Sequence, residues 1–462
     1  MSNVVLVTID SLRADHLGCF GYDRDTSPVI DGLAEGGLSF DAYANSTWTR
    51  ASFPSIITST YPLEYGGFES LSENRTTVGT AVSRGGHRTA ALHSNLWLSA
   101  EYGYDRGFDY FYDSKSDPDL TSRIRAWVKL HLDHDGLVYR TLQWLYDTTE
   151  EKAGMDVGST YRDAETITDE AVDWLRRIDS STGGDGDRDV FCWVHYMDVH
   201  HPYVPHEDAA ADLGLSFDFG ERGAIKLRRN MLEEPESLTD EEFETLVDLY
   251  DNEIRYTDAQ IGRLLDVVEE TVGMEDTAVV VTSDHGEEFA EHGQFSHVPS
   301  FYEEVLHVPL VVGGADRVGA SEATGHQPEE LELLDVAPTV CDLAGIEPPE
   351  EYRGRSALDA VGSGEDARVF SETWRDEDYK LSYRADGAKL IWNRETGEKE
   401  FYDLETDPGE TENLVETDER AGEYEERIRE HLAELRETNE ELPEVAMDAE
   451  TEERLRNLGY LE

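Results

Sequence analysis

Two uninterrupted runs of apolar, mostly β-branched residues stand out in the hydrophobic pattern of this chain. They cover residues 4–9 and 278–283, and polar residues follow each at once, Asp10 after the first and Asp284-His285 after the second. Such runs are typical of strands buried in a parallel sheet, where ligands gather at the carboxyl ends of the strands. We therefore expect the two strands to lie side by side and to bring Asp10, Asp284 and His285 to one point.

Apolar segments alternate between strand and helix along much of the remaining chain, which predicts an α/β fold. The longest helix is predicted over 237–272, where Leu238-Thr-Asp-Glu-Glu offers an N-terminal cap before an apolar stripe of helical spacing. The other predicted elements of this core are helices at 28–36, 49–58 and 76–84 and strands at 89–93, 190–197 and 308–312.

After about residue 365 the pattern changes to short strands and an acidic terminal helix. This change divides the chain into a large unit, residues 1–364, and a smaller one, residues 365–462. Within the large unit, the stretch from about 115 to 187 is predicted to be a mostly helical insertion. The small unit is predicted to be an α+β subdomain. Its predicted elements are short strands at 368–372, 379–383 and 389–392 and an acidic helix at 418–437.

The chain is strongly acidic, with 102 Asp and Glu against 39 Lys and Arg and a formal charge of −63. Disorder is a poor explanation, because apolar periodic segments and aromatic residues recur throughout. A uniformly acidic, Lys-poor surface suits a high-salt cytoplasm, where ions screen the repulsion between like charges. We therefore expect a halophilic, cytoplasmic protein, and we expect neither nucleic acid nor anionic lipid as its partner.

Neither a membrane span nor a disulfide framework is expected. No apolar segment reaches the length of a spanning helix, and no charged-then-apolar leader precedes Val4. The three cysteines, Cys19, Cys192 and Cys341, are odd in number and widely spaced. This spacing favours separate burial over a disulfide or a metal site.

The residues at the two predicted strand ends suit metal-dependent chemistry. Carboxylate and imidazole groups together can hold a divalent metal ion. Between the two strands lies the hydroxyl-rich segment Ser46-Thr47-Trp48-Thr49-Arg50, directly before a helix-like stretch. Each piece alone has an ordinary explanation, since strands often end in Asp and Asp-His-Gly is commonly a turn. Together the pieces favour a metallo-hydrolase.

A series of short motifs also runs nearly end to end along the chain. In order they are Asp10-Ser-Leu-Arg13-Ala-Asp-His-Leu-Gly18-Cys-Phe-Gly-Tyr22, Thr26-Ser-Pro28, the stretch 49–62, Gly107-Phe108-Asp109, Asp198-Val-His200-His-Pro202-Tyr203, Asp284-His285-Gly286-Glu287, Val308-Pro309-Leu310-Val311, Asp335-Val-Ala-Pro338-Thr339, Tyr402-Asp-Leu404-Glu-Thr-Asp407-Pro408-Gly409-Glu410 and Leu455-Arg-Asn-Leu-Gly459-Tyr460. In kind and order they resemble the landmarks of the sulfatase-like branch of the alkaline phosphatase superfamily. The resemblance implies an α/β core with a mixed, mostly parallel sheet flanked by helices, plus a small C-terminal α+β subdomain.

The resemblance also implies a nucleophile and a metal site. It places an oxygen nucleophile at Thr49 and one divalent ion (Mn²⁺, Mg²⁺, Zn²⁺ or Ca²⁺) in a cage of Asp10, Thr49, Asp284 and His285. Metal coordination lowers the pKa of the hydroxyl and aligns the alkoxide with a phosphorus or sulfur centre. The ordinary alternative for Thr49 is a helix N-cap, a role compatible with catalysis because a helix N-terminus also favours an anionic substrate.

Two histidines and two arginines complete the expected pocket. By resemblance, His200 and His297 lie where the family places residues beside the transferred group, so either can protonate the leaving oxygen or bind anionic oxygens. Arg13 and Arg50 are candidates to clamp the anion, with ordinary surface ion pairs as the alternative. Neighbouring histidines without an assigned role are His195, His201 and His292.

The chain departs from true sulfatases at the nucleophile. Sulfatases convert a Cys or Ser within Cys/Ser-x-Pro-x-Arg into an aldehyde, whereas this segment reads Thr49-Arg-Ala-Ser-Phe53 and Thr cannot yield that aldehyde. Ser11 stands where sulfatases carry a second Asp, and His93-Ser94-Asn95 where they carry a Gly-Lys pair. Relatives that hydrolyse phosphodiesters or phosphonates, or transfer phosphoglycerol, use Thr directly, so we favour a phosphorus ester. A second metal is not expected, because no Asp-x-x-x-His segment is seen.

The expected activity is hydrolysis or transfer of an anionic ester carried by a small molecule, a glycan or a lipid. Three alternatives stay open. They are a sulfuric ester hydrolase of the arylsulfatase kind, a phosphoglycerol-type transferase that needs an acceptor alcohol, and a non-catalytic binding protein on the same fold. The sequence decides neither the substrate, nor hydrolysis against transfer, nor the oligomeric state.

Overall fold

The architecture is taken from a computed structural model of the chain. It describes residues 2–113, 161–179, 188–297, 299–314, 323–365, 367–375 and 378–438. Most of the predicted insertion at 115–187 and the terminal motif at 455–460 lie outside these residues. The described part of 115–187 contains one helix, α6 (Ala164–Asp179), as predicted in kind.

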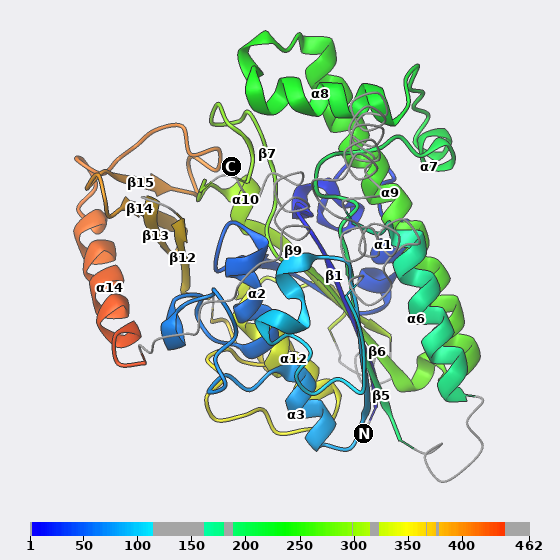
Figure 1. Cartoon of the computed structure of the whole chain (residues 1–462). Coiled ribbons are helices and arrows are strands. Elements are labelled where there is room, and N and C mark those ends of the chain that lie inside the picture. Colours follow the sequence, from blue (N-terminus) through cyan, green and yellow to red (C-terminus); the bar gives the residue numbers. More distant parts are fainter. Residues whose placement is uncertain are drawn as a thin grey trace, which may run out of the picture.

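A mixed sheet forms the centre of the molecule (Figure 1). Its strands stand in the order β10, β2, β9, β6, β1, β5, β3, β4, and β11 pairs with β2. β9 runs antiparallel to both of its neighbours, while the remaining pairs are parallel. The bounds are β1 Asn3–Ile9, β2 Leu38–Tyr43, β3 Arg88–Leu92, β4 Tyr110–Tyr112, β5 Val190–Tyr196, β6 Thr277–Ser283, β9 His307–Gly314, β10 Gly325–His326 and β11 Leu331–Glu332.

Helices cover both faces of this sheet, which explains why its central strands are apolar on both sides (Figure 1). Along β1, Val4 and Leu6 belong to one core and Val5 and Val7 to the other, and all four side chains are fully buried. One face carries α2 (Thr49–Thr58), α3 (Val78–Arg84) and α12 (Val336–Leu343). The other face carries α1 (Pro28–Gly36), α6 and α9 (Asp240–Thr271).

The longest predicted helix is confirmed as α9, which begins at a capping box. The Thr239 hydroxyl accepts the Glu242 N–H, and the Glu242 carboxylate accepts the Thr239 N–H. The predicted apolar stripe faces the core through Leu246, Tyr250 and Ile254, which are at most 1% exposed. The position of this helix matters for the site, because its middle passes the loop that follows β5.

A second, antiparallel sheet forms the C-terminal part of the described chain (Figure 1). It is a meander of β12 (Val369–Arg375), β13 (Asp378–Ala385), β14 (Ala388–Asn393) and β15 (Lys399–Asp403), covered by α14 (Arg420–Leu435). Leu381, Leu390 and Ile428 share its small core. The predicted α+β subdomain is therefore present, with β15 as a strand that the sequence pattern had not indicated. The remaining elements are α7 Glu207–Asp212, α8 Glu221–Glu233, β7 Glu288–Phe289, β8 Phe295–Ser296, α10 Glu303–Leu306 and α13 Ala357–Ala360.

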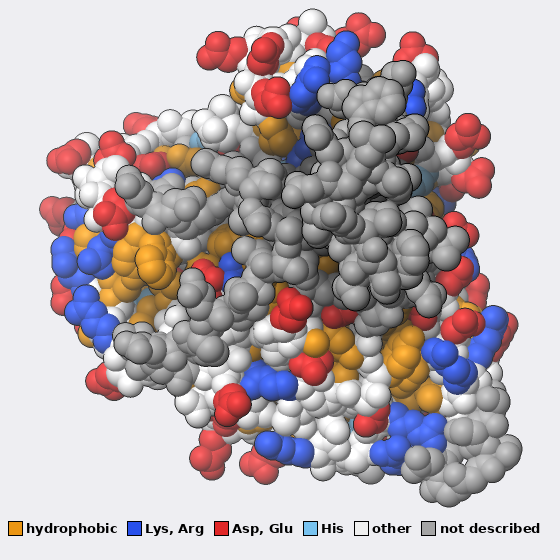
Figure 2. Space-filling view, viewed as in Figure 1, with side chains coloured by type: hydrophobic (Ala, Val, Ile, Leu, Met, Phe, Trp, Pro, Cys, Tyr) orange, Lys and Arg blue, Asp and Glu red, His pale blue; other side chains and the backbone are white. Residues whose placement is uncertain are grey.

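The surface matches the acidic composition. Figure 2 shows Asp and Glu side chains scattered over the visible face, with Lys and Arg in smaller groups among them. Within the described residues, the search for a helix both long and apolar enough to cross a bilayer finds none. The three cysteines are free, with Cys192 and Cys341 buried as predicted and Cys19 partly exposed.

Candidate active site

The carboxyl ends of β1 and β6 bring the three predicted strand-end ligands together. The strands pair in parallel with Ile9 opposite Ser283, so Asp10 and Asp284 leave the sheet side by side. One ligand atom each of Asp10, Asp284 and His285 lies within 4.8 Å of the other two, and all three side chains are fully buried. The sequence therefore located this cluster correctly.

Two polar atoms in the cluster have no hydrogen-bond partner among the described residues, which leaves them available to a cation. Asp284 Oδ2 and His285 Nε2 form no hydrogen bond with the described residues. The His285 Nδ1–H donates to the carbonyl of Gly286 at 2.9 Å, so Nε2 is the ring nitrogen that faces the carboxylates, 3.5 Å from Asp284 Oδ2 and 3.7 Å from Asp10 Oδ1. Two carboxylates and a deprotonated imidazole nitrogen are a donor set that divalent cations accept.

Burial and mutual repulsion act on the two carboxylates. Burial, and then the negative charge of Asp10, raise the pKa of Asp284 well above its usual range. Burial opposes the ionisation of Asp10 as well, but its contact with His195 and the nearby imidazoles outweigh this and lower its pKa. A bound cation would remove the repulsion and let both groups carry charge.

Thr49 lies beside this cluster at the start of α2. Its Oγ1 donates a hydrogen bond to Asp10 Oδ2 at 3.2 Å, and its side chain is fully buried. The N-cap of the helix is Trp48, so Thr49 is the first helical residue and not the cap that the ordinary interpretation supposed. The helix N-terminus points its partial positive charge toward the same place. The predicted nucleophile, the candidate ligands and a helix end that favours anions thus lie close together.

The structure adds neighbours that the sequence had not assigned to the metal cluster. The Asn95 amide donates to Asp10 Oδ2 at 3.2 Å, and His195 Nε2 lies 3.6 Å from the same oxygen. The Ser11 N–H lies 3.3 Å from Asp284 Oδ1 and donates to it. His195 faces Asp10 because β5 pairs with β1, with His195 opposite Thr8. The sequence shows that polar residues lie in this region, but it does not show which of them face Asp10.

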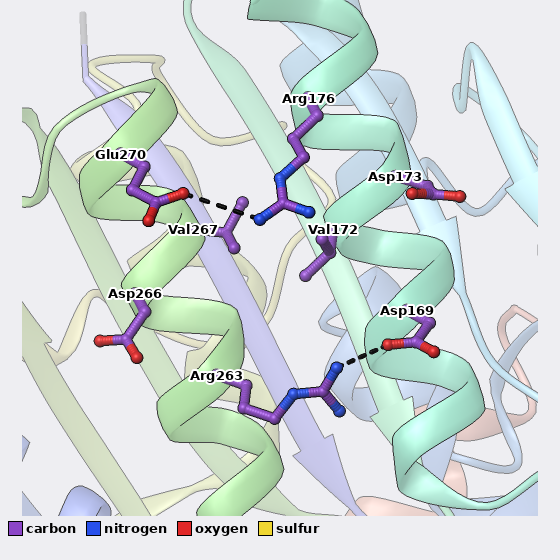
Figure 3. Close-up of a pocket in the computed structure, with 8 residues that line it drawn as sticks. All are labelled: Asp169, Val172, Asp173, Arg176, Arg263, Asp266, Val267 and Glu270. Atoms are coloured by element: carbon purple, nitrogen blue, oxygen red, sulfur yellow. Dashed lines mark hydrogen bonds and ion pairs between the residues drawn. The ribbon is translucent and has the colours of Figure 1, made fainter.

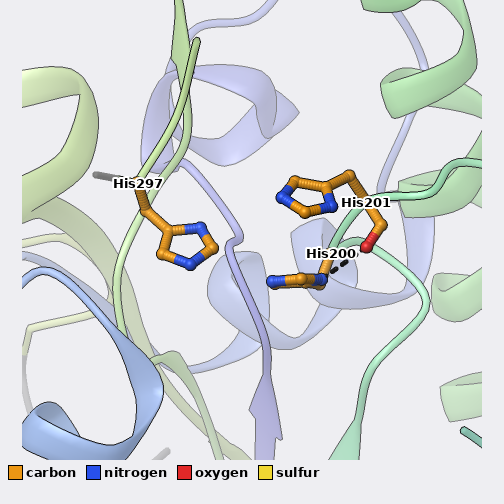
Figure 4. Close-up of side chains that lie close together, drawn as sticks. All are labelled: His200, His201 and His297. Carbon is orange, nitrogen blue, oxygen red and sulfur yellow. Dashed lines mark hydrogen bonds between the residues drawn. The ribbon is translucent and has the colours of Figure 1, made fainter. Parts of the chain in front are cut away.

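Three histidines lie close together (Figure 4). They lie next to the cluster formed by Asp10, Asp284 and His285. His200 and His297, both predicted, have ring centroids 5.0 Å apart, and the His297 ring lies 4.5 Å from that of His285. His201, which the sequence left unassigned, completes the group. The two predicted histidines therefore lie at the site, and His297 contacts the Asp10, Asp284 and His285 cluster through His285.

His201 is a poor metal ligand despite its position. The Arg228 Nε–H donates to His201 Nδ1 at 3.1 Å, and a guanidinium cannot accept. Nδ1 must then be the acceptor, so Nε2 carries the proton and donates to Ser296 Oγ at 3.0 Å. Both ring nitrogens are engaged, and a guanidinium beside them repels a cation. His201 with Arg228 instead makes this side of the pocket suited to an anion.

His200 and Glu287 complete the polar lining. The His200 Nδ1–H donates to the His201 carbonyl at 2.6 Å, which orients its ring. Burial lowers the pKa of His200 to about 4 and raises the pKa of Glu287 to about 7. Glu287 Oε2 accepts the Tyr203 hydroxyl at 3.0 Å, and Oε1 lies 3.9 Å from His297 Nδ1. Glu287 had no predicted role.

The two predicted arginine clamps are both paired with acids. Arg13 is buried and donates to Asp15 at 2.7 and 2.9 Å and to Glu291 at 2.6 Å. Arg50 contacts Glu69 and stacks on Trp97, with its guanidinium carbon 4.2 Å from the ring centroid. Both arginines therefore form the ion pairs that were stated as the alternative, although Arg13 is buried and not at the surface.

A surface depression between α6 and α9 contrasts with this site (Figure 3). Ion pairs bridge it, Arg263 to Asp169 at 2.6 Å and Arg176 to Glu270 at 3.7 Å. It lies between two helices and is lined by exposed charged side chains. Strand ends, and not the size of a surface hollow, define the candidate site in this protein.

Family models and curated relatives match most of this chain. The family model described as Sulfatase matches residues 2–346, and the model described as N-sulphoglucosamine sulphohydrolase, C-terminal, matches residues 290–438. Arylsulfatase of Clostridium perfringens is 25% identical over 466 residues, covering 92% of this chain and 92% of that protein. Arylsulfatase K of Mus musculus is 24% identical over 462 residues, covering 89% of this chain and 76% of that protein.

Solved structures give the same picture of the fold. Phosphonate monoester hydrolase of Agrobacterium radiobacter superposes with a TM-score of 0.67 at 19% identity, covering 95% of this chain and 96% of that one. A protein solved in complex with its substrate D-glucosamine-2-N,6-O-disulfate superposes with a TM-score of 0.68 at 18% identity, covering 94% and 98%. The predicted core with a mixed, mostly parallel sheet and a C-terminal subdomain is confirmed.

Proposed function

Because this chain belongs to the sulfatase family and is an ester hydrolase of the alkaline phosphatase superfamily, we propose that it cleaves or transfers a phosphorus ester with Thr49 as nucleophile. The position of Thr49 carries the proposal. Its Oγ1 lies 3.2 Å from Asp10 Oδ2, and Asp10 belongs to the cluster of metal-ligand side chains. A hydroxyl at that point is aimed at any ester bound between the cluster and the histidines.

The donor set fits one divalent metal ion of the Mn²⁺, Mg²⁺, Zn²⁺ or Ca²⁺ class. Asp10, Asp284 and His285 would hold it, with Thr49 beside them. The fit is supported by the buried Asp284 Oδ2 and His285 Nε2, which form no hydrogen bond with the described residues. When bound, the ion would lower the pKa of a neighbouring hydroxyl and offset charge on the transferred group.

Two residues of the chain would act on protons in the reaction, Asp10 on the proton of the Thr49 hydroxyl and His297 on the proton that the leaving alcohol needs. Asp10 Oδ2 accepts the hydrogen bond of the Thr49 hydroxyl and so directs the lone pairs of that oxygen toward the ester. His297 is the better candidate to protonate the leaving alcohol, because its ring lies 4.5 Å from that of His285, whereas burial lowers the pKa of His200 to about 4. Water or a second alcohol then releases the group from Thr49, giving a hydrolase or a transferase.

The choice of phosphorus over sulfur rests on what stands at the nucleophile. Thr49 cannot form the aldehyde that sulfatases use. Ser11 stands where the sulfatase pattern has an acid, and Asn95 belongs to the segment that stands where it has a Gly-Lys pair. The Ser11 hydroxyl and the Asn95 amide both donate to Asp10, each at 3.2 Å. A neutral amide and a hydroxyl suit a site whose nucleophile is a plain alcohol.

A sulfate ester is the second candidate. Curated relatives carry the name arylsulfatase, and one structural neighbour was solved with a sulfated glucosamine as its substrate. Arg228 and His201 form an anion-favouring wall that suits the charged group of either ester. The ester is expected on a small molecule, a glycan or a lipid, and a phosphoglycerol-type transferase would be recognised by its need for an acceptor alcohol.

The test compares matched aryl esters: a phosphate monoester, a phosphodiester, a phosphonate monoester and a sulfate, at multimolar salt with Mn²⁺. Thr49→Ala should abolish turnover of the preferred phosphorus ester, while Thr49→Ser should retain part of it. Thr58→Ala, at the other end of the same helix, is the matched control and should leave turnover intact. Sulfate turnover that survives Thr49→Ala would show that the nucleophile is misplaced.

We also infer that the enzyme works in the high-salt cytoplasm of a halophile. The formal charge of −63, from 102 acidic against 39 basic residues, supports this inference. Self-repulsion on such a surface falls as salt shortens the Debye length from about 10 Å at 0.1 M to about 3 Å at 1 M. Melting temperature and activity should therefore rise together from dilute buffer to molar KCl, and a flat response would contradict the inference.

A further inference from the structure

A second cluster of metal-ligand side chains lies where the loop after β5 crosses α9. Asp198 and His206 come from that loop and Glu253 from the middle of the helix. One ligand atom of each lies within 4.8 Å of the other two. Asp198 is 2% exposed and Glu253 is fully buried. Burying two carboxylates this close together is costly unless something neutralises them.

Each carboxylate has one oxygen fixed by the backbone and one left for another partner. The Ala164 N–H donates to Asp198 Oδ1 at 2.9 Å, while Asp198 Oδ2 forms no hydrogen bond with any described residue. The Val204 N–H donates to Glu253 Oε1, and Glu253 Oε2 lies 2.8 Å from His206 Nε2. Such backbone bonds orient ligands in the way that outer partners do at known metal sites.

His206 is placed like a ligand at the edge of the cluster. Its ring stacks face to face on Tyr256, with centroids 3.6 Å apart and planes 3° from parallel, so its rotation is restricted. Nε2 points to the carboxylates, and the side chain retains 22% exposure, which leaves a route from solvent. One half-buried imidazole can offset at most one of the two buried carboxylates, even when it carries a proton.

Among the charged groups near Asp198, more oppose its ionisation than favour it. The charged groups that act most strongly on Asp198 are Glu253 and Asp163, which oppose its ionisation, and His206, which favours it. Burial raises the pKa of Asp198 and that of Glu253 above their usual values. The alternatives are a carboxylic acid that keeps its proton and a cation bound between the two groups.

We propose that Asp198, Glu253 and His206 bind a second divalent metal ion, separate from the Asp10 cluster. Two carboxylate oxygens and one imidazole nitrogen favour Mn²⁺ or Zn²⁺ over Ca²⁺ and Mg²⁺, which prefer oxygen alone. The ion ties the loop after β5 to α9, and Asp198 stands two residues before His200. It is therefore a structural ion that holds the His200 loop in place, and its binding does not depend on the proposed reaction.

The decisive variant is Asp198→Asn, which keeps the shape and the acceptor for the Ala164 N–H but loses the charge. Protein equilibrated with Mn²⁺ or Zn²⁺ is desalted in about 1 M KCl, where weak surface binding is screened, and its metal content is measured. We expect two ions per chain in the wild type and one in Asp198→Asn. Asp208→Asn, an exposed acid in the first turn of α7 and two residues after His206, should keep both.

A second measurement separates this site from the active site. In an Asp284→Asn background, where the first site is impaired, Mn²⁺ should still raise the melting temperature, and adding Asp198→Asn or Glu253→Gln should abolish that rise. A lone carboxylic acid predicts the reverse, because Asp198→Asn would then leave metal content unchanged and melting equal or higher with or without Mn²⁺. Equal metal content in wild type and Asp198→Asn would overturn the proposal, whatever the protein does with esters.

Discussion

Lys389 offers the sharpest stability prediction, because it is a fully buried charge that joins the two sheets. It lies on β14, and its Nζ is 2.8 Å from Glu303 Oε1 and 2.7 Å from Glu410 Oε1. Burial opposes the ionisation of Glu303, yet the charges of Lys389 and Arg384 hold its pKa near 2. Glu303 belongs to α10, directly before β9 of the central sheet.

Replacing Lys389 with Met keeps the length of the side chain and removes the charge. Arg384 still contacts Glu303, with its Nε 3.3 Å away, so Glu410 loses most. Removing one partner of a buried ion pair costs about 3–5 kcal/mol, because the other charge stays buried and unpaired. Adding Glu410→Gln should recover part of this loss, since it removes the stranded carboxylate.

The assay is urea unfolding at constant high salt, with Lys399→Met as the matched control. Lys399 lies on the neighbouring strand β15 and pairs with Glu425, but its side chain is 27% exposed. An exposed pair contributes about 1 kcal/mol or less, so the control should lose little. Equal losses for the two Lys→Met variants would refute the reasoning that burial makes Lys389 costly to remove.

Three further predictions concern pH, the leaving group and the metal. Asp258 accepts the Val29 and Ile30 N–H groups, and burial raises its pKa to about 7. Since this exceeds the unfolded value of about 3.9, its contribution to stability is complete below about pH 4 and is lost as pH rises through about 7. From pH 5 to 9 the wild type should therefore lose about 1–3 kcal/mol of unfolding free energy relative to Asp258→Asn in unfolding titrations. The acceptor that Asn lacks adds only a pH-independent offset, so a difference that does not change with pH would contradict this. His297→Gln should slow alkyl esters by about 100-fold or more while sparing aryl esters, and a uniform loss in kcat would exclude the acid role. Asp10→Asn should weaken Mn²⁺ binding by more than about 100-fold in equilibrium dialysis, and unchanged affinity would remove Asp10 from the ligand set.

Much of the fold was predictable because buried parallel strands and capped helices leave clear patterns. The apolar runs at 4–9 and 278–283 form β1 and β6, and the segment with a cap and an apolar stripe forms α9. The sequence gives no comparable signal for β2, where Ser39 and Asp41 interrupt the apolar run, or for the reversed direction of β9. Strand direction depends on connections far apart in the chain, which local periodicity does not report.

Some residues of the candidate site could be predicted from the sequence and others could not. Asp10, Asp284 and His285 were predictable because adjacent residues at the ends of paired strands must meet. His195 and Asn95 were not, since their contact with Asp10 depends on the register of β5 and on a loop after β3. The cluster of Asp198, His206 and Glu253 could not be predicted from the sequence. Its residues come from a loop and from the middle of a helix, without any recognisable spacing.

The most direct test of the central claim is to trap the covalent intermediate on Thr49. Wild-type enzyme turning over its best aryl phosphorus ester is quenched in acid, digested and mapped by mass spectrometry. The account predicts that the phosphoryl group, with any substituent that it retains, is found on the peptide that begins α2 and is localised to Thr49. A burst of released phenol with that peptide unmodified, or with the group on another residue, would contradict it.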